Sequence, residues 1–265
     1  MKFISKIYHK YKYYILLFLI IILIISFLNK SIERFVIEKK GIDNISGCAY
    51  INLENRKDRK ELLVKEFEKM KIPKDKIHKV AAIYKPKNGY KGCTQSHILG
   101  LRIGKMNNWE NTLILEDDAQ LNCSPEEFQT QLTKMFNYLS GKKWDVIVLS
   151  KANEQLEDLN DAPNDIKKIN SSTLTSGYIV KNHYLQSLID LFEEGNENMK
   201  DNIWRKDGGQ EYEPNVSDQI WRRLQKKDNW FGFTQDLIKQ REIWSDSLHN
   251  PDDKDMEDKW DKSLQ

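Results

Sequence analysis

The sequence contains few cysteines, few prolines and almost no net charge. Its 265 residues include three cysteines, six prolines and twelve glycines, and the formal net charge is +2. Cys48, Cys93 and Cys123 form no C-x-x-C pair and have no spacing typical of a zinc site. The odd count leaves at least one free thiol, and a single disulfide remains open. The near-neutral balance lacks the basic patch of a nucleic-acid-binding protein, so we expect no nucleic-acid partner.

Several nucleotide-binding and hydrolytic motifs are also missing. The chain has no P-loop, no Gly-x-Gly-x-x-Gly fingerprint and no Gly-x-Ser-x-Gly elbow. No internal repeat is visible. Hydrophobic residues make up 39% and charged residues 31% of the chain, which suits a soluble enzyme domain rather than a protein with many membrane spans.

Beyond the N-terminus, the sequence has no long hydrophobic run. Residues 13–28 are almost wholly apolar, slightly short of the about 20 residues that a spanning helix needs. No small-x-small cleavage site follows, so we expect a membrane anchor rather than a signal peptide. Lysines cluster before it, which predicts a single-pass type II protein with its C-terminal domain lumenal (endoplasmic reticulum or Golgi) or otherwise non-cytoplasmic. The predicted parts are a cytoplasmic tail (1–12), the anchor (13–28), a stem (29–46), a globular domain (47–245) and a charged tail (246–265).

Short apolar runs alternate with amphipathic segments through the globular domain. We expect strands at 49–53, 77–83, 112–115, 144–149, 176–180 and 230–234, and helices at 56–70, 93–106, 125–139, 182–192 and 217–225. This alternation predicts an α/β fold with a mostly parallel sheet. The polar segments 151–170 and 195–215 are expected to be loops.

The acidic run Glu116-Asp117-Asp118 directly follows the clearest buried strand. Carboxylates at the carboxyl edge of a parallel sheet lie where open α/β sheets bind ligands, and hard divalent cations prefer oxygen ligands. Adjacent carboxylates repel one another by about 4 kcal/mol per pair at 4 Å and an effective dielectric near 20, unless a cation or basic groups neutralise them. The run is therefore a candidate metal site, and the alternative is a solvated acidic turn.

A second candidate site follows the first strand. Arg56 and Arg59 lie three residues apart at the start of a predicted helix, close to Asn52 at the end of that strand. Guanidinium groups at a helix N-terminus suit a diphosphate. An ordinary basic first turn of a helix is the alternative.

Taken in order, these motifs resemble glycosyltransferase family 25, which includes lipopolysaccharide β-galactosyltransferases and collagen galactosyltransferases. The resemblance runs from about Tyr50 to Leu237. The motifs that carry it are Ile51-Asn52-Leu53 with Arg56 and Arg59, Gly92-Cys93-Thr94-Gln95-Ser96-His97, Leu115-Glu116-Asp117-Asp118, Trp144-Asp145-Val146-Ile147, Thr175-Ser176-Gly177-Tyr178-Ile179-Val180 and Ser217-Asp218-Gln219.

The resemblance implies a GT-A-like (Rossmann-like) fold and an inverting, manganese-dependent transfer of a hexose, galactose or glucose, from a UDP-sugar. The acceptor would be a glycan, a lipid-linked acceptor such as lipopolysaccharide, or a protein hydroxylysine. The roles implied are donor binding by Asn52, Arg56, Arg59, Ser96, Glu116 and Asp117, metal binding by Asp118 with Glu116, and general-base catalysis by Asp218.

Some features leave other interpretations open. Ile83-Tyr84 stand where the family often has aspartate and glycine, and Gln219 follows Asp218 where it often has a second acid. His249 is a candidate third metal ligand, a role that C-terminal histidines play in some GT-A enzymes, or an ordinary tail residue. The alternatives are a catalytically degenerate, membrane-tethered binding module or, less in keeping with the scattered histidines, a metal-dependent phosphoesterase.

Overall fold

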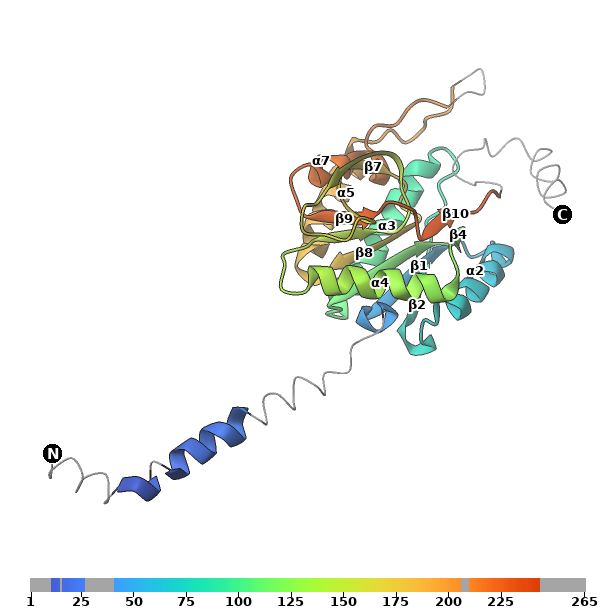
Figure 1. The fold of residues 1–265 in the computed structure, drawn as a ribbon. Coiled ribbons are helices and arrows are strands. Elements are labelled where there is room, and N and C mark those ends of the chain that lie inside the picture. Colours follow the sequence, from blue (N-terminus) through green and yellow to red (C-terminus); the bar gives the residue numbers. More distant parts are fainter. Residues whose placement is uncertain (1–10, 15, 27–40, 206–209, 244–265) are drawn as a thin grey trace. The chain divides into compact units, whose positions relative to one another are not determined.

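The computed structural model describes residues 11–14, 16–26, 41–205 and 210–243 (Figure 1). The chain divides into two compact units, Met1–Lys39 and Lys40–Gln265. In the first unit, residues 11–14 and 16–26 are helical. Within the described ranges, no helix combines the length and the apolar character needed to cross a membrane. The expected anchor includes residues 15, 27 and 28, which lie outside those ranges, as do most of the expected tails and stem.

The second unit is built on an eight-stranded sheet with the order β2-β1-β3-β8-β5-β9-β7-β6. Its strands are β1 (Gly47–Asn52), β2 (Ile77–Ala81), β3 (Asn111–Glu116), β5 (Val146–Val148), β6 (Ala152–Asp158), β7 (Ile166–Thr173), β8 (Gly177–Lys181) and β9 (Trp230–Phe233). A two-stranded sheet pairs β4 (Ala119–Leu121) with β10 (Ile238–Gln240). The helices are α2 (Lys57–Met70), α3 (Gly89–Met106), α4 (Pro125–Leu139), α5 (Leu185–Asn198), α6 (Ser217–Ile220) and α7 (Arg222–Gln225), with 3-10 turns η1 (Gly41–Asn44), η2 (Lys74–Lys76) and η3 (Asn182–Tyr184).

Most strands of the large sheet run in one direction. β1 is parallel to β2 and β3, and β5 is parallel to β9. β8 is antiparallel to both β3 and β5, and β7 is antiparallel to β9 and β6. Only β8 and β7 therefore oppose the other strands, which confirms the predicted α/β fold with a mostly parallel, though mixed, sheet.

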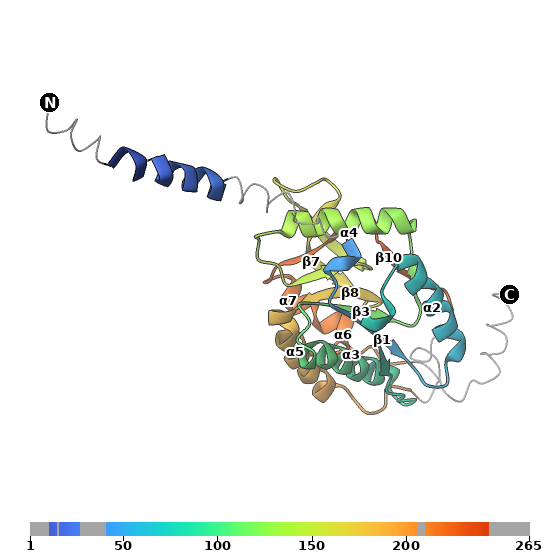
Figure 2. The ribbon, with the colours of Figure 1, turned by 90° about the horizontal axis from the view of Figure 1, so that it is seen from below.

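Helices cover both faces of this sheet (Figures 1 and 2). Figure 2 shows α4 on one side and α3 with α5 on the other. Leu113 of β3 packs in a core with residues of α2 and α4, and its neighbour Ile114 packs in a second core with residues of α3 and α5. This alternation follows from the pleat of a strand, in which successive side chains point to opposite faces.

Two helix starts are fixed by side-chain caps. The Ser124 hydroxyl accepts a hydrogen bond from the Glu127 amide at 3.1 Å, and Pro125 follows at the first position of α4, as the sequence predicts. The Asn88 side chain accepts from the Lys91 amide at 3.0 Å, so α3 begins at Gly89, earlier than expected. The early start adds a turn beside the end of β2.

Several expected loop or stem segments are structured. The expectation of a loop at 151–170 is wrong, because the segment forms β6 and part of β7. β6 is the edge strand, and its mostly exposed polar residues give no apolar alternation from which a strand is predicted. Residues 41–46 were expected in the stem but belong to the second unit, where Ile42 and Ile45 are buried in the core. Cys48, Cys93 and Cys123 are all free thiols.

Candidate active site at the carboxyl edge of the sheet

The predicted acidic run lies where three parallel strands end. Asn52 closes β1, Ala81 closes β2 and Glu116 closes β3. A pocket of about 100 Å³ opens at this edge, and α3 forms another of its walls. Its lining includes Asn52, Arg59, Tyr84, Lys85, Cys93, Ser96, Glu116, Asp117, Asp118 and Gln240. The structure thus brings both candidate sequence sites into one cavity.

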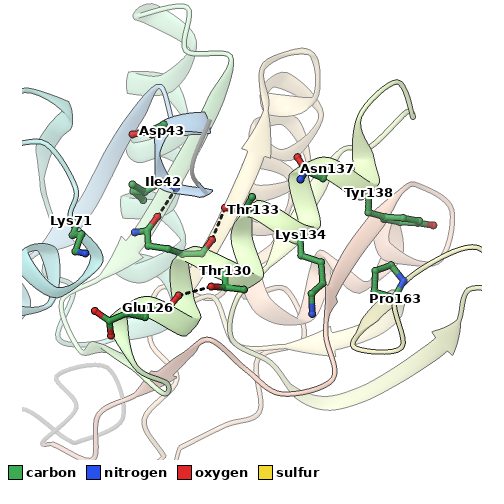
Figure 3. Close-up of a pocket in the computed structure, with 11 residues that line it drawn as sticks. Ile42, Asp43, Lys71, Glu126, Thr130, Thr133, Lys134, Asn137, Tyr138 and Pro163 are labelled. Carbon is green, nitrogen blue, oxygen red and sulfur yellow. Dashed lines mark hydrogen bonds between the residues drawn. The ribbon is translucent and has the colours of Figure 1, made fainter. Parts of the chain in front are cut away.

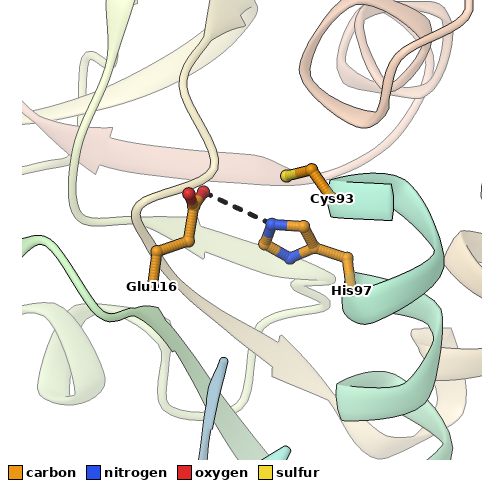
Figure 4. Close-up of side chains that lie close together, drawn as sticks. All are labelled: Cys93, His97 and Glu116. Carbon is orange, nitrogen blue, oxygen red and sulfur yellow. Dashed lines mark hydrogen bonds and ion pairs between the residues drawn. The ribbon is translucent and has the colours of Figure 1, made fainter. Parts of the chain in front are cut away.

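Glu116 is held as a carboxylate. One of its oxygens accepts from the Thr175 hydroxyl at 2.8 Å and lies 3.3 Å from Nε2 of His97 (Figure 4). Burial raises the pKa of Glu116, but the contacts with His97 and Thr175 and the charge of Arg59 outweigh burial and lower it below its ordinary value. Glu116 is therefore ionised at neutral pH.

His97 is fully buried on α3, between Glu116 and a tyrosine. Its Nδ1 lies 3.0 Å from the Tyr178 hydroxyl. Because ionised Glu116 only accepts hydrogen bonds, Nε2 of His97 carries a proton and donates it to Glu116, while Nδ1 pairs with the Tyr178 hydroxyl. The structure thus makes His97, the last residue of the Gly92 to His97 motif, a direct partner of the acidic run.

Asp117 points away from its neighbours into a buried ion pair. Its two oxygens accept from Arg59 at 3.0 Å and from the Asn52 amide at 2.8 Å. Burial raises the pKa of Asp117, and Arg59 and Asn52 offset only part of that rise. Asp117 therefore fixes the positions of Asn52 and Arg59, the two residues of the second candidate site that line the pocket.

Asp118 carries the least compensated carboxyl group of the run. Only 7% of its surface is exposed, and Oδ2 accepts from Gln240 at 3.0 Å. Within the described residues, Oδ1 is buried without a hydrogen-bond partner. Burial, followed by repulsion from Glu116, raises the pKa of Asp118 to about 7. A bare carboxylate oxygen beside an ionised glutamate is a donor set that suits a hard divalent cation, so these residues fit the manganese implied by the resemblance.

Arg56 and Ser96 are committed to local structure. Arg56 makes a bidentate pair with Asp58, at 2.8 and 3.1 Å, and is not among the described residues that line the pocket. The Ser96 hydroxyl donates to the Gly92 carbonyl at 2.7 Å and accepts from the Ile83 amide at 2.8 Å. Ser96 thus ties the chain after β2 to α3 at the pocket wall. This close approach requires Gly92, because an added Cβ would lie 2.3 Å from the Ile83 carbonyl oxygen.

Asp218 lies on α6, close to the same group of side chains. Its Oδ2 accepts from the Leu174 amide at 3.3 Å. The pKa of Asp218 is raised overall, mainly by burial and also by repulsion from Glu116. The hydrogen bond from the Leu174 amide and the charge of His97 offset only part of this rise. After burial, the charges of Glu116, Asp218, Asp118 and Asp117 all raise the pKa of the Cys93 thiol. The acidic run and Asp218, from two distant parts of the chain, therefore both lie close enough to Cys93 on α3 to influence its thiol. His249, the other candidate ligand, lies outside the described residues.

The structure adds two site residues to which the sequence analysis assigned no role, Thr175 and Gln240. Thr175 holds Glu116 and Gln240 holds Asp118. Gln240 reaches Asp118 because β10 pairs with β4, directly after the acidic run. A short strand of three residues with two exposed side chains gives no usable signal in the sequence.

A wider groove of about 820 Å³ lies elsewhere, along α4 (Figure 3). It is lined by Ile42, Asp43, Lys71, Glu126, Gln129, Thr130, Thr133, Lys134, Asn137, Tyr138 and Pro163. Several of its polar groups are engaged locally: Gln129 accepts from the Ile42 amide, and the Thr130 hydroxyl donates to the Glu126 carbonyl. None of the sequence-predicted site residues within the described ranges lines it.

Comparisons with known proteins point to one family. The family model of glycosyltransferase family 25 (LPS biosynthesis protein) matches residues 74–204. No curated protein matches the chain. Among solved structures, A197 from STIV is 10% identical with a TM-score of 0.38, covering 77% of this chain and 90% of its own. Mannose-1-phosphate geranyltransferase from Thermus thermophilus is 10% identical with a TM-score of 0.41, covering 76% and 75%. Both scores are too low to support an argument.

Proposed function

Residues 74–204 belong to glycosyltransferase family 25, and we propose that this chain transfers a hexose, galactose or glucose, from a UDP-sugar to a hydroxyl of a glycan, lipopolysaccharide or hydroxylysine-type acceptor. The matched range includes the acidic run and the Cys93 to His97 part of α3. It excludes Asn52, Arg59 and Asp218, so their roles rest on the geometry of the pocket and on the motifs.

The proposal rests on the environment of the Asp118 carboxyl group. Among the described residues, a buried Asp118 oxygen has no hydrogen-bond partner and is repelled by ionised Glu116, and this arrangement is costly unless a ligand neutralises it. Perturbed carboxyl groups of this kind, at the carboxyl edge of a sheet, are typical of functional sites. Asp118 and Glu116 would hold a divalent cation such as Mn²⁺, which when bound offsets charge on the leaving diphosphate.

Other side chains of the protein would bind the donor and accept the proton of the acceptor. Arg59, fixed by Asp117, would contact the donor diphosphate together with Asn52. Asp218 would take the proton of the acceptor hydroxyl as its oxygen bonds to the anomeric carbon. The bond from that carbon to the diphosphate breaks at the same time, UDP leaves, and the anomeric configuration inverts. The raised pKa of Asp218 makes its carboxylate a stronger base than an exposed aspartate.

UDP release from the full-length chain, purified in detergent, tests this proposal. The chain is incubated with manganese, a panel of UDP-sugars and candidate acceptors. We expect turnover with one sugar, abolished by EDTA and lowered at least about 10²-fold in Asp118→Ala, as for loss of a group that stabilises transition-state charge. Asp43→Ala is the matched control, since Asp43 is an exposed aspartate of the wide groove. Full activity in Asp118→Ala would refute the metal assignment. UDP binding without turnover for any acceptor would instead favour the binding module.

We also propose that residues 13–28 anchor the chain in a membrane with the N-terminus cytoplasmic. The apolar run and the lysines before it support this placement. Protease treatment of sealed microsomes should leave the C-terminal domain intact, and complete digestion would contradict the orientation.

A further inference from the structure

Three different metal-binding side chains meet at one corner of the pocket. Cys93 and His97 are four residues apart on α3 and therefore lie on the same face of the helix, and Glu116 comes from the end of β3 (Figure 4). The sulfur of Cys93, a ring nitrogen of His97 and a carboxylate oxygen of Glu116 all lie within 4.8 Å of one another. A hard cation has no preference for a thiol, so this cluster has a chemistry different from that of Asp118.

The spacing of these atoms suits a tetrahedral ion. With Zn–N and Zn–O bonds of about 2.0–2.2 Å, tetrahedral angles place the nitrogen and oxygen ligands about 3.4 Å apart. Nε2 of His97 and Oε1 of Glu116 are 3.3 Å apart without an ion. A Zn–S bond of about 2.3 Å requires the sulfur about 3.5 Å from the nitrogen, and these two atoms already lie within 4.8 Å of one another.

The Asp118 oxygen that supports the oxygen-bound cation of the transfer reaction also shows that this pocket suits a positive ion. Asp118, which is more than nine-tenths buried, has one oxygen without a hydrogen-bond partner in the described part of the chain. Asp118, Cys93 and Glu116 all line the same pocket. Asp118 is not part of the cluster whose ligand atoms lie within 4.8 Å of one another, so the fourth position of a tetrahedral site would be open to a solvent ligand from the pocket.

We propose that Cys93, His97 and Glu116 form a site for a thiophilic divalent ion, with Zn²⁺ as the expected metal. On binding, the Cys93 thiol releases its proton and the sulfur bonds the ion. His97 would bind the ion through Nε2 without a proton there and keep a proton on Nδ1, which the Tyr178 oxygen accepts and which fixes the ring. Through Glu116 the ion competes with the oxygen-bound cation of the transfer reaction, a consequence that rests on the proposed function.

Cobalt absorption of the full-length chain tests the site without any sugar donor. Co²⁺ bound to a thiolate shows a sulfur-to-metal charge-transfer band, and Zn²⁺ should displace it. We expect the band in the wild type and its loss in Cys93→Ser. Cys123→Ser should retain it, because Cys123 is a partly buried thiol whose sulfur lies 4.0 Å from the Leu237 carbonyl oxygen and is not in the cluster. No band in the wild type, or an unchanged band in Cys93→Ser, would overturn the proposal.

A second variant separates metal binding from folding. Tyr178→Phe removes only the hydroxyl that orients His97, and loss of such an orienting contact weakens metal affinity about 10- to 100-fold. Zn²⁺ affinity is measured by competition with a chromogenic chelator, and circular dichroism checks the fold of each variant. Unchanged zinc affinity in both Cys93→Ser and Tyr178→Phe would exclude this cluster. Since neither readout uses UDP, failure of the transferase assay leaves this test intact.

Discussion

The small pocket at the strand ends and the wide groove along α4 differ in how much their charged side chains destabilise the folded state. The groove has about eight times the volume, about 820 Å³ against about 100 Å³, and its charged residues include exposed Asp43 and Glu126. The pocket buries Asp117 and Asp118 and leaves one carboxylate oxygen of Asp118 without a hydrogen-bond partner among the described residues. Cavity size therefore does not mark the site. The candidate site is distinguished instead by buried carboxyl groups that destabilise the folded state, because stability alone would favour apolar or amide side chains at those positions.

The largest expected effect is on turnover in Asp218→Asn. The amide keeps the shape of the side chain but cannot take the proton of the acceptor hydroxyl, so we expect kcat to fall about 10²- to 10⁴-fold. Asp43→Asn, in the groove, should leave kcat unchanged. A kcat of Asp218→Asn close to that of the wild type would mean that another group is the base.

The pH profile of turnover gives an independent measure of Asp218. The base must be deprotonated, and burial raises the pKa of this carboxyl, so the rate should rise with pH through a value above the ordinary aspartate pKa of about 3.9. The residual activity of Asp218→Asn should lack this acidic limb. A limb at the same pH in the variant would assign it to a different group.

Removal of one partner of an ion pair should destabilise the protein more in the pocket than in the groove. Among the described residues, Arg59→Met leaves buried Asp117 with the Asn52 side-chain amide as its hydrogen-bond donor, and breaking a buried pair costs about 3–5 kcal/mol. Lys134→Met, in the groove, breaks a pair with Asp165 in which both side chains are about one-third exposed, worth about 0–1 kcal/mol. Urea unfolding followed by tryptophan fluorescence measures both. Equal losses would remove the contrast between pocket and groove.

Asp118→Asn should stabilise the protein while it lowers turnover. The folded pKa of about 7, in place of 3.8, means that ionisation costs the folded state on the order of 4 kcal/mol at high pH. The buried amide retains part of the desolvation cost, so we expect a gain of about 1–3 kcal/mol in EDTA at pH 8.

The raised pKa of Asp118 sets the pH range in which Asp118→Asn is expected to stabilise the protein. Since the folded pKa of Asp118 is raised, the contribution of Asp118 to wild-type stability falls as pH rises from about 4 to about 7 and is then level. The advantage of Asp118→Asn should therefore disappear below pH of about 4, where the carboxyl is protonated in both states. An advantage that stays constant with pH would show that ionisation of Asp118 is not its source.

Local patterns in the sequence predicted much of the framework. β1, β3, α2 and α4 were expected close to their observed positions, because apolar runs, helical spacing and the Ser124-Pro125 start are encoded within a few residues. β6 was missed because an edge strand with exposed polar side chains has the composition of a loop. Local patterning thus fails where an element is defined by its neighbour rather than by its own buried face.

The same limit applies to the site. The acidic run and Arg59 were predicted at the strand ends, and the structure places both in the pocket. The different partners of adjacent acids in the run were not predictable from the sequence. Asp117 pairs with Arg59, whereas Glu116 pairs with His97. Those partners come from α2 and α3, so the opposite pKa shifts of Glu116 and Asp118 depend on packing that spacing alone does not reveal.

The smallest expected effect concerns Thr130, a residue of α4 that lines the groove. Its hydroxyl donates to the Glu126 carbonyl four residues earlier at 2.9 Å, a contact that slightly destabilises helices. Alanine is also the better helix former, so Thr130→Ala should stabilise the protein by about 0.5 kcal/mol. Urea unfolding and UDP release on the same preparation check this prediction. In the pocket, the stabilising change at Asp118 should lower turnover. In the groove, the stabilising change should leave turnover intact, and a loss of turnover in Thr130→Ala would show that the groove takes part in the reaction.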